Sequence, residues 1–221
     1  MLNQQALNDQ ARDQMIEQQV RAWDVLDTRV LDVFRKVRRE LFVPEQHRYL
    51  AFADVEVPLA HGQHMLRPNV AGRLLQALEL AGSERVLEIG AGTGFFTACL
   101  AAVSANVRSL EIFGDFAERA KANLSSLNVR NAEIVTEDAN KFESDVKYDA
   151  IAVTASLPLY DERFQRQLAI GGRLIVVVGE RPIMDARLVR RMSEDAWVTE
   201  SLFETVLDPL INAQRRQEFI F

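Results

Sequence analysis

The segment Arg85–Thr97 constrains the fold of this chain more than any other. An apolar run of strand length (85–89) is followed by Gly90, Gly92 and Gly94 at alternate positions, and then by apolar residues at helical spacing. Because glycine lacks a Cβ, such a turn adopts dihedrals that other residues avoid and lets a ligand approach the backbone closely. A strand, a glycine turn and a helix N-terminus in this order predict a nucleotide-like ligand at the edge of an α/β sheet.

The spacing of the glycines distinguishes a site for a dinucleotide from a site for another nucleotide-like ligand. In the dinucleotide fingerprint Gly-x-Gly-x-x-Gly, amides at the start of the helix face a pyrophosphate. Here Glu88 precedes the turn, and Phe95 stands where the third glycine of that fingerprint would fall. A carboxylate at this point repels a pyrophosphate but suits a ligand that is cationic or carries an amino group and hydroxyls. This argues against the alternative of a nicotinamide-dependent oxidoreductase.

The glycine turn, read as Glu88-Ile89-Gly90-Ala91-Gly92-Thr93-Gly94, resembles motif I of the Rossmann-like S-adenosylmethionine-dependent methyltransferases. The resemblance implies S-adenosyl-L-methionine as the cofactor. Glu111 ends the next predicted strand, about 20 residues on, where a carboxylate contacts a ribose in such units. Asp138 follows the strand after that and is placed to accept a hydrogen bond from an adenine amino group. The alternative for either acid is an ordinary solvated carboxylate. The predicted cofactor site comprises Glu88, Gly90, Ala91, Gly92, Gly94, Glu111, Ile112, Asp138 and Ala139.

Strand and helix patterns alternate from Arg85 onward. Periodicity predicts strands at 85–89, 107–112, 132–136, 148–154 and 173–179, and helices at 94–104, 115–127 and 160–169. Such alternation predicts an α/β fold with a doubly wound, mostly parallel Rossmann-like sheet and helices on both faces. Residues rich in β-branched and aromatic side chains predict antiparallel C-terminal strands at 187–192, 196–207 and 216–221.

The N-terminal part differs from this core. Helical spacing predicts helices at 6–22 and 27–39, a loop-like tract at 47–69 and a helix at 69–81. With 221 residues and 48% hydrophobic content, the chain can bury one full core. We therefore expect a single methyltransferase domain over 1–221, with a helical extension and substrate loop at 1–68 and a cofactor-binding core at 69–221.

Composition excludes several partners. The net charge of −6 offers no footprint for nucleic acid. The local basic run, Arg35, Lys36, Arg38 and Arg39, is interpreted as a solvated helix end. Cys99 is the single cysteine, so no intrachain disulfide forms, and its place on an apolar helix face predicts burial. We find no apolar run of membrane-spanning length and no signal peptide, and we expect a cytoplasmic protein without a membrane partner or a metal.

The region before the glycine turn adds a closer resemblance. Val37-Arg38-Arg39-Glu40-Leu41-Phe42-Val43-Pro44, followed by Val57-Pro58-Leu59, Gly62-Gln63 and Pro68, resembles the N-terminal half of the protein-L-isoaspartate O-methyltransferases. That family methylates the α-carboxylate of L-isoaspartyl residues in damaged proteins, so the resemblance implies a damaged protein or peptide as the substrate. A carboxylate is already ionised at neutral pH, so catalysis would consist of alignment and exclusion of water. Oligomeric state stays open.

The loop 62–68 is the part that departs from the family pattern. His64 stands where the family has threonine, and Leu66 where it has the serine that contacts the substrate. We expect Gln63, His64 and Arg67 near the transferred methyl: His64 as base or donor, and Arg67 as a fork matched to a carboxylate. Because leucine makes no hydrogen bond, two alternatives stay open: a diverged methyltransferase with another, small acceptor, or a non-catalytic protein that binds S-adenosylmethionine.

Overall fold

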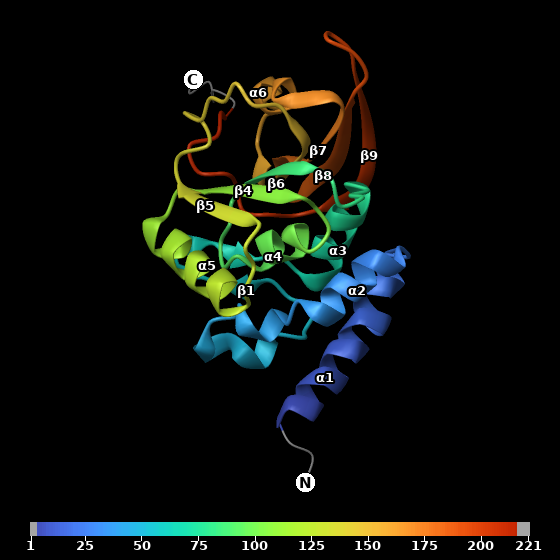
Figure 1. Cartoon of the computed structure of the whole chain (residues 1–221), viewed down its shortest axis with the longest axis vertical. Coiled ribbons are helices and arrows are strands. Elements are labelled where there is room, and N and C mark those ends of the chain that lie inside the picture. The colour runs from blue at the N-terminus through green and yellow to red at the C-terminus, as the bar shows by residue number, and fades with distance from the viewer. Residues whose placement is uncertain (1–3, 216–221) are drawn as a thin grey trace.

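The computed structural model describes residues 4–215, so the strand predicted at 216–221 lies outside the described residues. Its centre is a seven-stranded sheet with the order β5-β4-β3-β6-β7-β8-β9 (Figure 1). The parallel strands are β3 (Arg85–Ile89), β4 (Asn106–Glu111), β5 (Ala132–Thr136), β6 (Tyr148–Leu157) and β7 (Leu168–Glu180). Two antiparallel strands, β8 (Ile183–Arg191) and β9 (Trp197–Thr205), complete it. The predicted mostly parallel α/β sheet with antiparallel C-terminal strands is confirmed.

The helices cover the two faces of this sheet unequally. One face carries α3 (Pro68–Ala77), α4 (Phe95–Ala101) and α5 (Gly114–Ser126), and the other carries the short α6 (Glu162–Arg166) (Figure 1). Each face of the sheet has its own hydrophobic core, and successive side chains of β3 point to opposite faces. Val86 packs with the helices of the first face, and Leu87 packs with Phe164 of α6.

The helix predicted at 160–169 is too long. The apolar residues after Phe164 leave the helix, because Leu168 pairs with Tyr148 of β6 and the Tyr148 amide donates to the Gln167 carbonyl at 2.9 Å. Pairing with a strand distant in sequence overrides a helical pattern that is visible only locally.

The N-terminal extension is helical, as predicted. The helix α1 (Gln4–Met15) continues through a π-helical turn (Ile16–Val20) and a 3-10 turn (Arg21–Trp23). The second helix, α2 (Thr28–Lys36), begins at Asp27, whose side chain accepts from the Arg29 amide. A 3-10 turn at Arg39–Leu41 follows α2. The tract predicted as loop-like at 47–69 begins within a 3-10 turn at Glu45–Leu50 and holds another at Ala60–Gly62 and a short antiparallel hairpin of β1 (Val57–Pro58) and β2 (His64–Met65).

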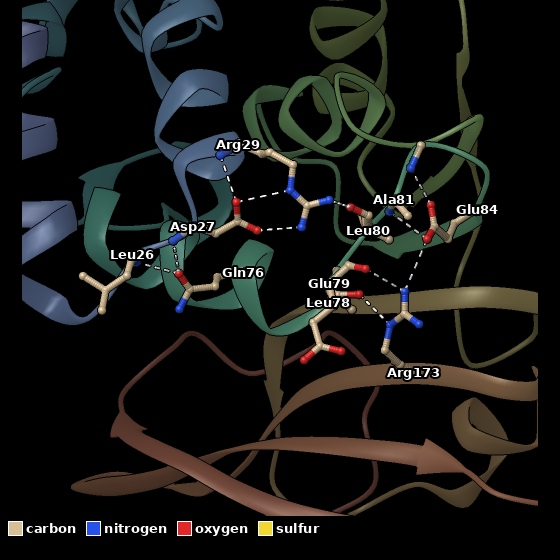
Figure 2. Close-up of polar contacts among 11 residues, drawn as sticks. Leu26, Asp27, Arg29, Gln76, Leu78, Glu79, Leu80, Ala81, Glu84 and Arg173 are labelled. Atoms are coloured by element: carbon tan, nitrogen blue, oxygen red, sulfur yellow. Dashed lines mark hydrogen bonds and ion pairs between the residues drawn. The ribbon is translucent and has the colours of Figure 1, made fainter.

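Polar contacts attach the extension to the core (Figure 2). The Gln76 Oε1 atom, at the end of α3, accepts from the Leu26 and Asp27 amides at 2.7 and 2.9 Å. The Arg29 guanidinium reaches the Leu80 carbonyl at 3.1 Å. On the other side of the same turn, Arg173 of β7 donates to backbone carbonyls, as Figure 2 shows. The turn after α3 thus joins the extension to the sheet.

Arg39 corrects the interpretation of the basic run. Arg35, Lys36 and Arg38 are exposed, as predicted, but Arg39 has no exposed surface. Its guanidinium lies over the Phe95 ring and donates to the Ala51 and Leu66 carbonyls at 3.1 and 2.7 Å. Burial lowers the pKa of Arg39 to about 10. Arg39 is therefore a core residue that connects the extension to the loop at Leu66.

Candidate functional site

A cleft opens at the carboxyl ends of β3, β4, β5 and β6, where the order of the strands reverses. From β3 the chain moves outward to β4 and β5, and then returns to β6 on the other side of β3. Such a switch point is the usual ligand site of open α/β sheets. About 780 Å³ of empty space, part of it continuous with the solvent, lies between the lining residues. This lining comes mainly from the sheet, from the β1–β2 hairpin, from the start of α5 and from the segment after β9.

The glycine turn forms the floor of the cleft. Gly90 has a φ of 96°, and a Cβ there would lie 2.5 Å from the Thr154 Oγ1 atom. That hydroxyl lies 2.7 Å from the Gly90 carbonyl oxygen and thereby closes the space behind the turn. Gly94 has a φ of 83° and starts α4, where a Cβ would lie 3.1 Å from the Ala120 Cβ of α5. Gly90 thus lets Thr154 pack against the turn, and Gly94 permits close packing of two helices.

Glu111 ends β4 and lines the cleft, as predicted. One of its carboxylate oxygens accepts from the Gly92 amide at 2.8 Å and the other from the Phe113 amide at 3.0 Å. Burial raises the pKa of Glu111, although these backbone hydrogen bonds oppose the shift. Each oxygen keeps a second lone pair, so the carboxylate can still accept from two neighbouring hydroxyls.

Glu88 lies apart from the cleft lining. It is fully buried, and its Oε2 atom accepts from the Ser109 hydroxyl at 2.6 Å and from the Thr97 hydroxyl at 2.5 Å. Burial raises the pKa of Glu88 to about 7, while the two hydroxyls oppose the shift. Glu88 therefore connects β3 to β4 and α4 beneath the glycine turn.

Asp138 and Ala139 follow β5 and line the cleft. The Asp138 oxygens accept from the Asn140 amide and from the Asn212 side chain, both at 3.0 Å. Burial acts to raise the pKa of Asp138, but these hydrogen bonds lower it. The carboxylate is thus ionised and oriented by groups from two separate segments.

The β1–β2 hairpin borders the cleft opposite the strands. Gln63, His64 and Leu66 line the cleft, whereas Arg67 is exposed and does not. His64 Nδ1 lies 2.9 Å from an Asp208 carboxylate oxygen. At the tip, the His61 ring stacks on Phe113 with centroids 4.1 Å apart.

The predicted cofactor residues fall into three groups by position. Gly90, Gly92, Glu111, Ile112, Asp138 and Ala139 line the cleft. Ala91 lines a smaller hollow that shares Leu59, His64 and Gly90 with it. Glu88 and Gly94 lie behind the turn and shape it.

Several lining residues escaped the sequence reasoning. Thr154 and Ala155 come from the end of β6, Phe113 and Phe116 from the start of α5, and Leu207, Asp208, Leu210 and Ile211 from the segment after β9. Nothing in the local pattern of the stretch 207–210 indicates a site. Its position beside the hairpin depends on contacts across the whole chain.

Two further observations concern the described residues. No group of three or more His, Cys, Asp or Glu within 4–215 is arranged to hold a metal ion. Over the same residues, no helix has both the length and the apolar character needed to cross a membrane. Cys99 is buried, as predicted.

The fold and the cleft define a Rossmann-like α/β protein with a nucleotide-type site at the switch point of its sheet. Comparison with known proteins makes the class specific. The chain belongs to the protein-L-isoaspartate(D-aspartate) O-methyltransferase family, whose model matches residues 10–215.

Individual relatives agree with this assignment. The chain is 40% identical to protein-L-isoaspartate O-methyltransferase 1 of Rhodopseudomonas palustris (strain HaA2), over 90% of this chain and 82% of that protein. It is 39% identical to the protein-L-isoaspartate O-methyltransferase of Methanoculleus marisnigri, over 81% and 83%. A Plasmodium falciparum structure described as a protein-L-isoaspartate O-methyltransferase in complex with S-adenosyl-L-homocysteine has a TM-score of 0.75 at 22% identity, over 89% and 96% of the two chains. This last likeness supports the fold.

Proposed function

We propose that this protein transfers the methyl group of S-adenosyl-L-methionine to the α-carboxylate of L-isoaspartyl residues in damaged proteins or peptides. The observation that carries the proposal is the joining, in one cleft, of the glycine turn and Glu111 with the hairpin residues Gln63 and His64. Membership of the family supports both the donor and the acceptor.

The residues of the cleft fit the proposed cofactor. Gly90 and Gly92 line the cleft without side chains, so a ligand can lie directly against their backbone. The Glu111 carboxylate can accept from ribose hydroxyls, and the ionised Asp138 can accept from an adenine amino group. When bound, S-adenosyl-L-methionine supplies an electrophilic methyl group on a sulfonium. Glu88 and Gly94 would act indirectly, because they shape the turn.

The chain's own residues would mainly orient and enclose the reactants. An acceptor carboxylate is a nucleophile without a general base, so the requirement is alignment of oxygen with the methyl carbon and exclusion of water. His64 and Gln63 can donate to the acceptor from the hairpin, while Leu66 supplies an apolar wall. Arg67 is exposed beside the cleft, and we propose that it attracts the acidic peptide from solution.

Methyl transfer to matched peptides tests the proposal. The protein is incubated with labelled S-adenosyl-L-methionine and an isoaspartyl peptide, with the aspartyl isomer as the control. We expect base-labile methyl ester on the isoaspartyl peptide only. Equal labelling of both peptides, or none, contradicts the proposed acceptor. Calorimetry with S-adenosyl-L-homocysteine tests the donor separately, because a protein that binds it without turning over any acceptor is not an enzyme of this type.

We also propose that the chain works as one domain, with 1–68 as extension and substrate loop and 69–221 as core. The hydrogen bonds of Gln76 and Arg29 and the stacking of Arg39 on Phe95 connect these parts and support this division of labour within a single unit. A cytoplasmic location and the absence of a nucleic-acid partner remain proposals, supported by one buried cysteine and a net charge of −6. Size-exclusion chromatography with light scattering would give the oligomeric state.

A further inference from the structure

Asp208 occupies a fixed position at the edge of the cleft. The Ser156 amide, in β6, donates to the Asp208 carbonyl at 2.8 Å, and the Ser156 hydroxyl donates to the Leu207 carbonyl at 3.1 Å. The Leu210 amide returns a hydrogen bond to the Ser156 carbonyl at 2.8 Å. Ser156 itself is fully buried. The backbone around Asp208 is therefore held to the sheet and does not depend on the hairpin.

The Asp208 carboxylate orients the imidazole of His64. One of its oxygens lies 2.9 Å from His64 Nδ1, and the two side chains are 18% and 35% exposed. A carboxylate on one ring nitrogen fixes the plane of the ring and leaves the other nitrogen for a ligand. Within residues 4–215 no protein group is bonded to His64 Nε2.

The His64 ring lies in a cleft whose other charged lining residues are acidic. Five acids line the cleft, namely Glu56, Glu111, Glu137, Asp138 and Asp208, whereas His64 is the only basic residue among the lining residues of the described chain. A carboxylate that enters such a cleft meets like charge from most directions. In its imidazolium form the His64 ring can donate from both nitrogens at once, to Asp208 and to an entering carboxylate next to the hairpin.

We infer that Asp208 is a positioning residue that aims His64 Nε2–H at the methyl-accepting carboxylate, and that this pair selects an anionic acceptor. This inference rests on the proposed function. The carboxylate oxygen that does not accept from His64 attacks the methyl carbon, so a C–O bond forms and the S–C bond breaks. The electron pair of that bond stays on sulfur. No proton moves in this step.

The Asp208→Asn variant separates this role from a purely structural one. Asparagine can still accept from Nδ1–H and hold the hairpin, but it lacks the negative charge of the carboxylate. We expect KM for the isoaspartyl peptide to rise roughly tenfold, as for the loss of a charge-assisted hydrogen bond. We expect kcat and the affinity for S-adenosyl-L-homocysteine to stay within about twofold. The matched control is Asp115→Asn, because His61 of the same hairpin contacts Asp115 at 3.0 Å. This control should leave KM for the peptide unchanged.

A double-mutant cycle tests whether Asp208 acts through His64. His64→Gln keeps an N–H donor that needs no carboxylate partner, so the Asp208→Asn change should have no further effect on KM in that background. An equal effect in both backgrounds, or an unchanged KM for Asp208→Asn alone, overturns the inference.

Failure of the proposed function gives a different result. In that case the unmodified protein forms no methyl ester on the isoaspartyl peptide. Calorimetric titration of the same peptide into protein saturated with S-adenosyl-L-homocysteine then decides the role of the pair. If the peptide binds and Asp208→Asn weakens that binding about tenfold, the role of the Asp208–His64 pair is supported. If the peptide does not bind, that role is refuted.

Discussion

Replacing Glu88 with glutamine should flatten the pH dependence of stability. Burial raises the pKa of Glu88 from 4.5 to about 7, against the opposing effect of Ser109 and Thr97. The folded protein therefore keeps this proton up to about pH 7, whereas the unfolded chain loses it above pH 4.5. Because the folded state binds more protons in this window, the free energy of unfolding falls as pH rises from 4.5 to 7 and levels off above it. A shift of roughly 2.5 units corresponds to about 3 kcal/mol.

Urea denaturation of both proteins at several pH values measures this effect. The difference in the free energy of unfolding, unmodified protein minus Glu88→Gln, should decrease by about 3 kcal/mol between pH 4.5 and 7.5. Subtraction removes the contribution of groups that the two proteins share. Glu84→Gln is a control for which the pH dependence of stability should have the opposite sign. Burial acts to raise the pKa of Glu84, but hydrogen bonds from the Ala81 and Gly82 amides lower it. Its contribution to stability is lost as pH falls. Equal pH slopes for Glu88→Gln and the unmodified protein would refute the argument.

Three further predictions concern the turn, the thiol and the extension. Gly90→Ala should lower the affinity for S-adenosyl-L-homocysteine roughly tenfold or more, because its Cβ would lie 2.5 Å from Thr154 Oγ1. The control is Gly82→Ala: Gly82 has a φ of 104° and open space around it, so this change should cost about 1–3 kcal/mol of stability and leave that affinity unchanged. Burial raises the pKa of the Cys99 thiol, so a disulfide reagent should react with it only after unfolding in urea. Gln76→Ala should lower the free energy of unfolding by about 1–3 kcal/mol, since two backbone amides lose their acceptor; an unchanged urea midpoint would contradict this.

The core of the fold could be predicted because its signals are local. The apolar run before the glycine turn is β3 at the predicted residues 85–89, and the strand predicted at 132–136 is β5 with the same bounds. A helix that ends in a strand is harder to predict. Leu168 continues the apolar spacing of α6, and only its pairing with Tyr148 assigns it to β7.

Charged residues were the least predictable from the sequence. Arg39 belongs to a run of cations that resembles a solvated helix end, yet its stacking on Phe95 and its bond to the Leu66 carbonyl bury it completely. The contact of His64 with Asp208 joins residues 144 positions apart, and no periodicity encodes such a contact. The glycine turn, the strand-end acids and the hairpin could thus be inferred from motifs, whereas the wall of the cleft after β9 required the tertiary structure.

The segment after β9, which forms one wall of the cleft, also determines when the cleft becomes complete during synthesis. The glycine turn and the hairpin emerge from the ribosome well before Leu207, and N-terminal segments generally fold first. A nascent chain that reaches only Thr205 can form strands up to β9, but it lacks Asp208 beside His64 and the Asn212 bond to Asp138. One side of its cleft is missing. The cleft is therefore completed only after the strands of the sheet have been synthesised, and a product truncated at Thr205 would retain most of the sheet without the finished site.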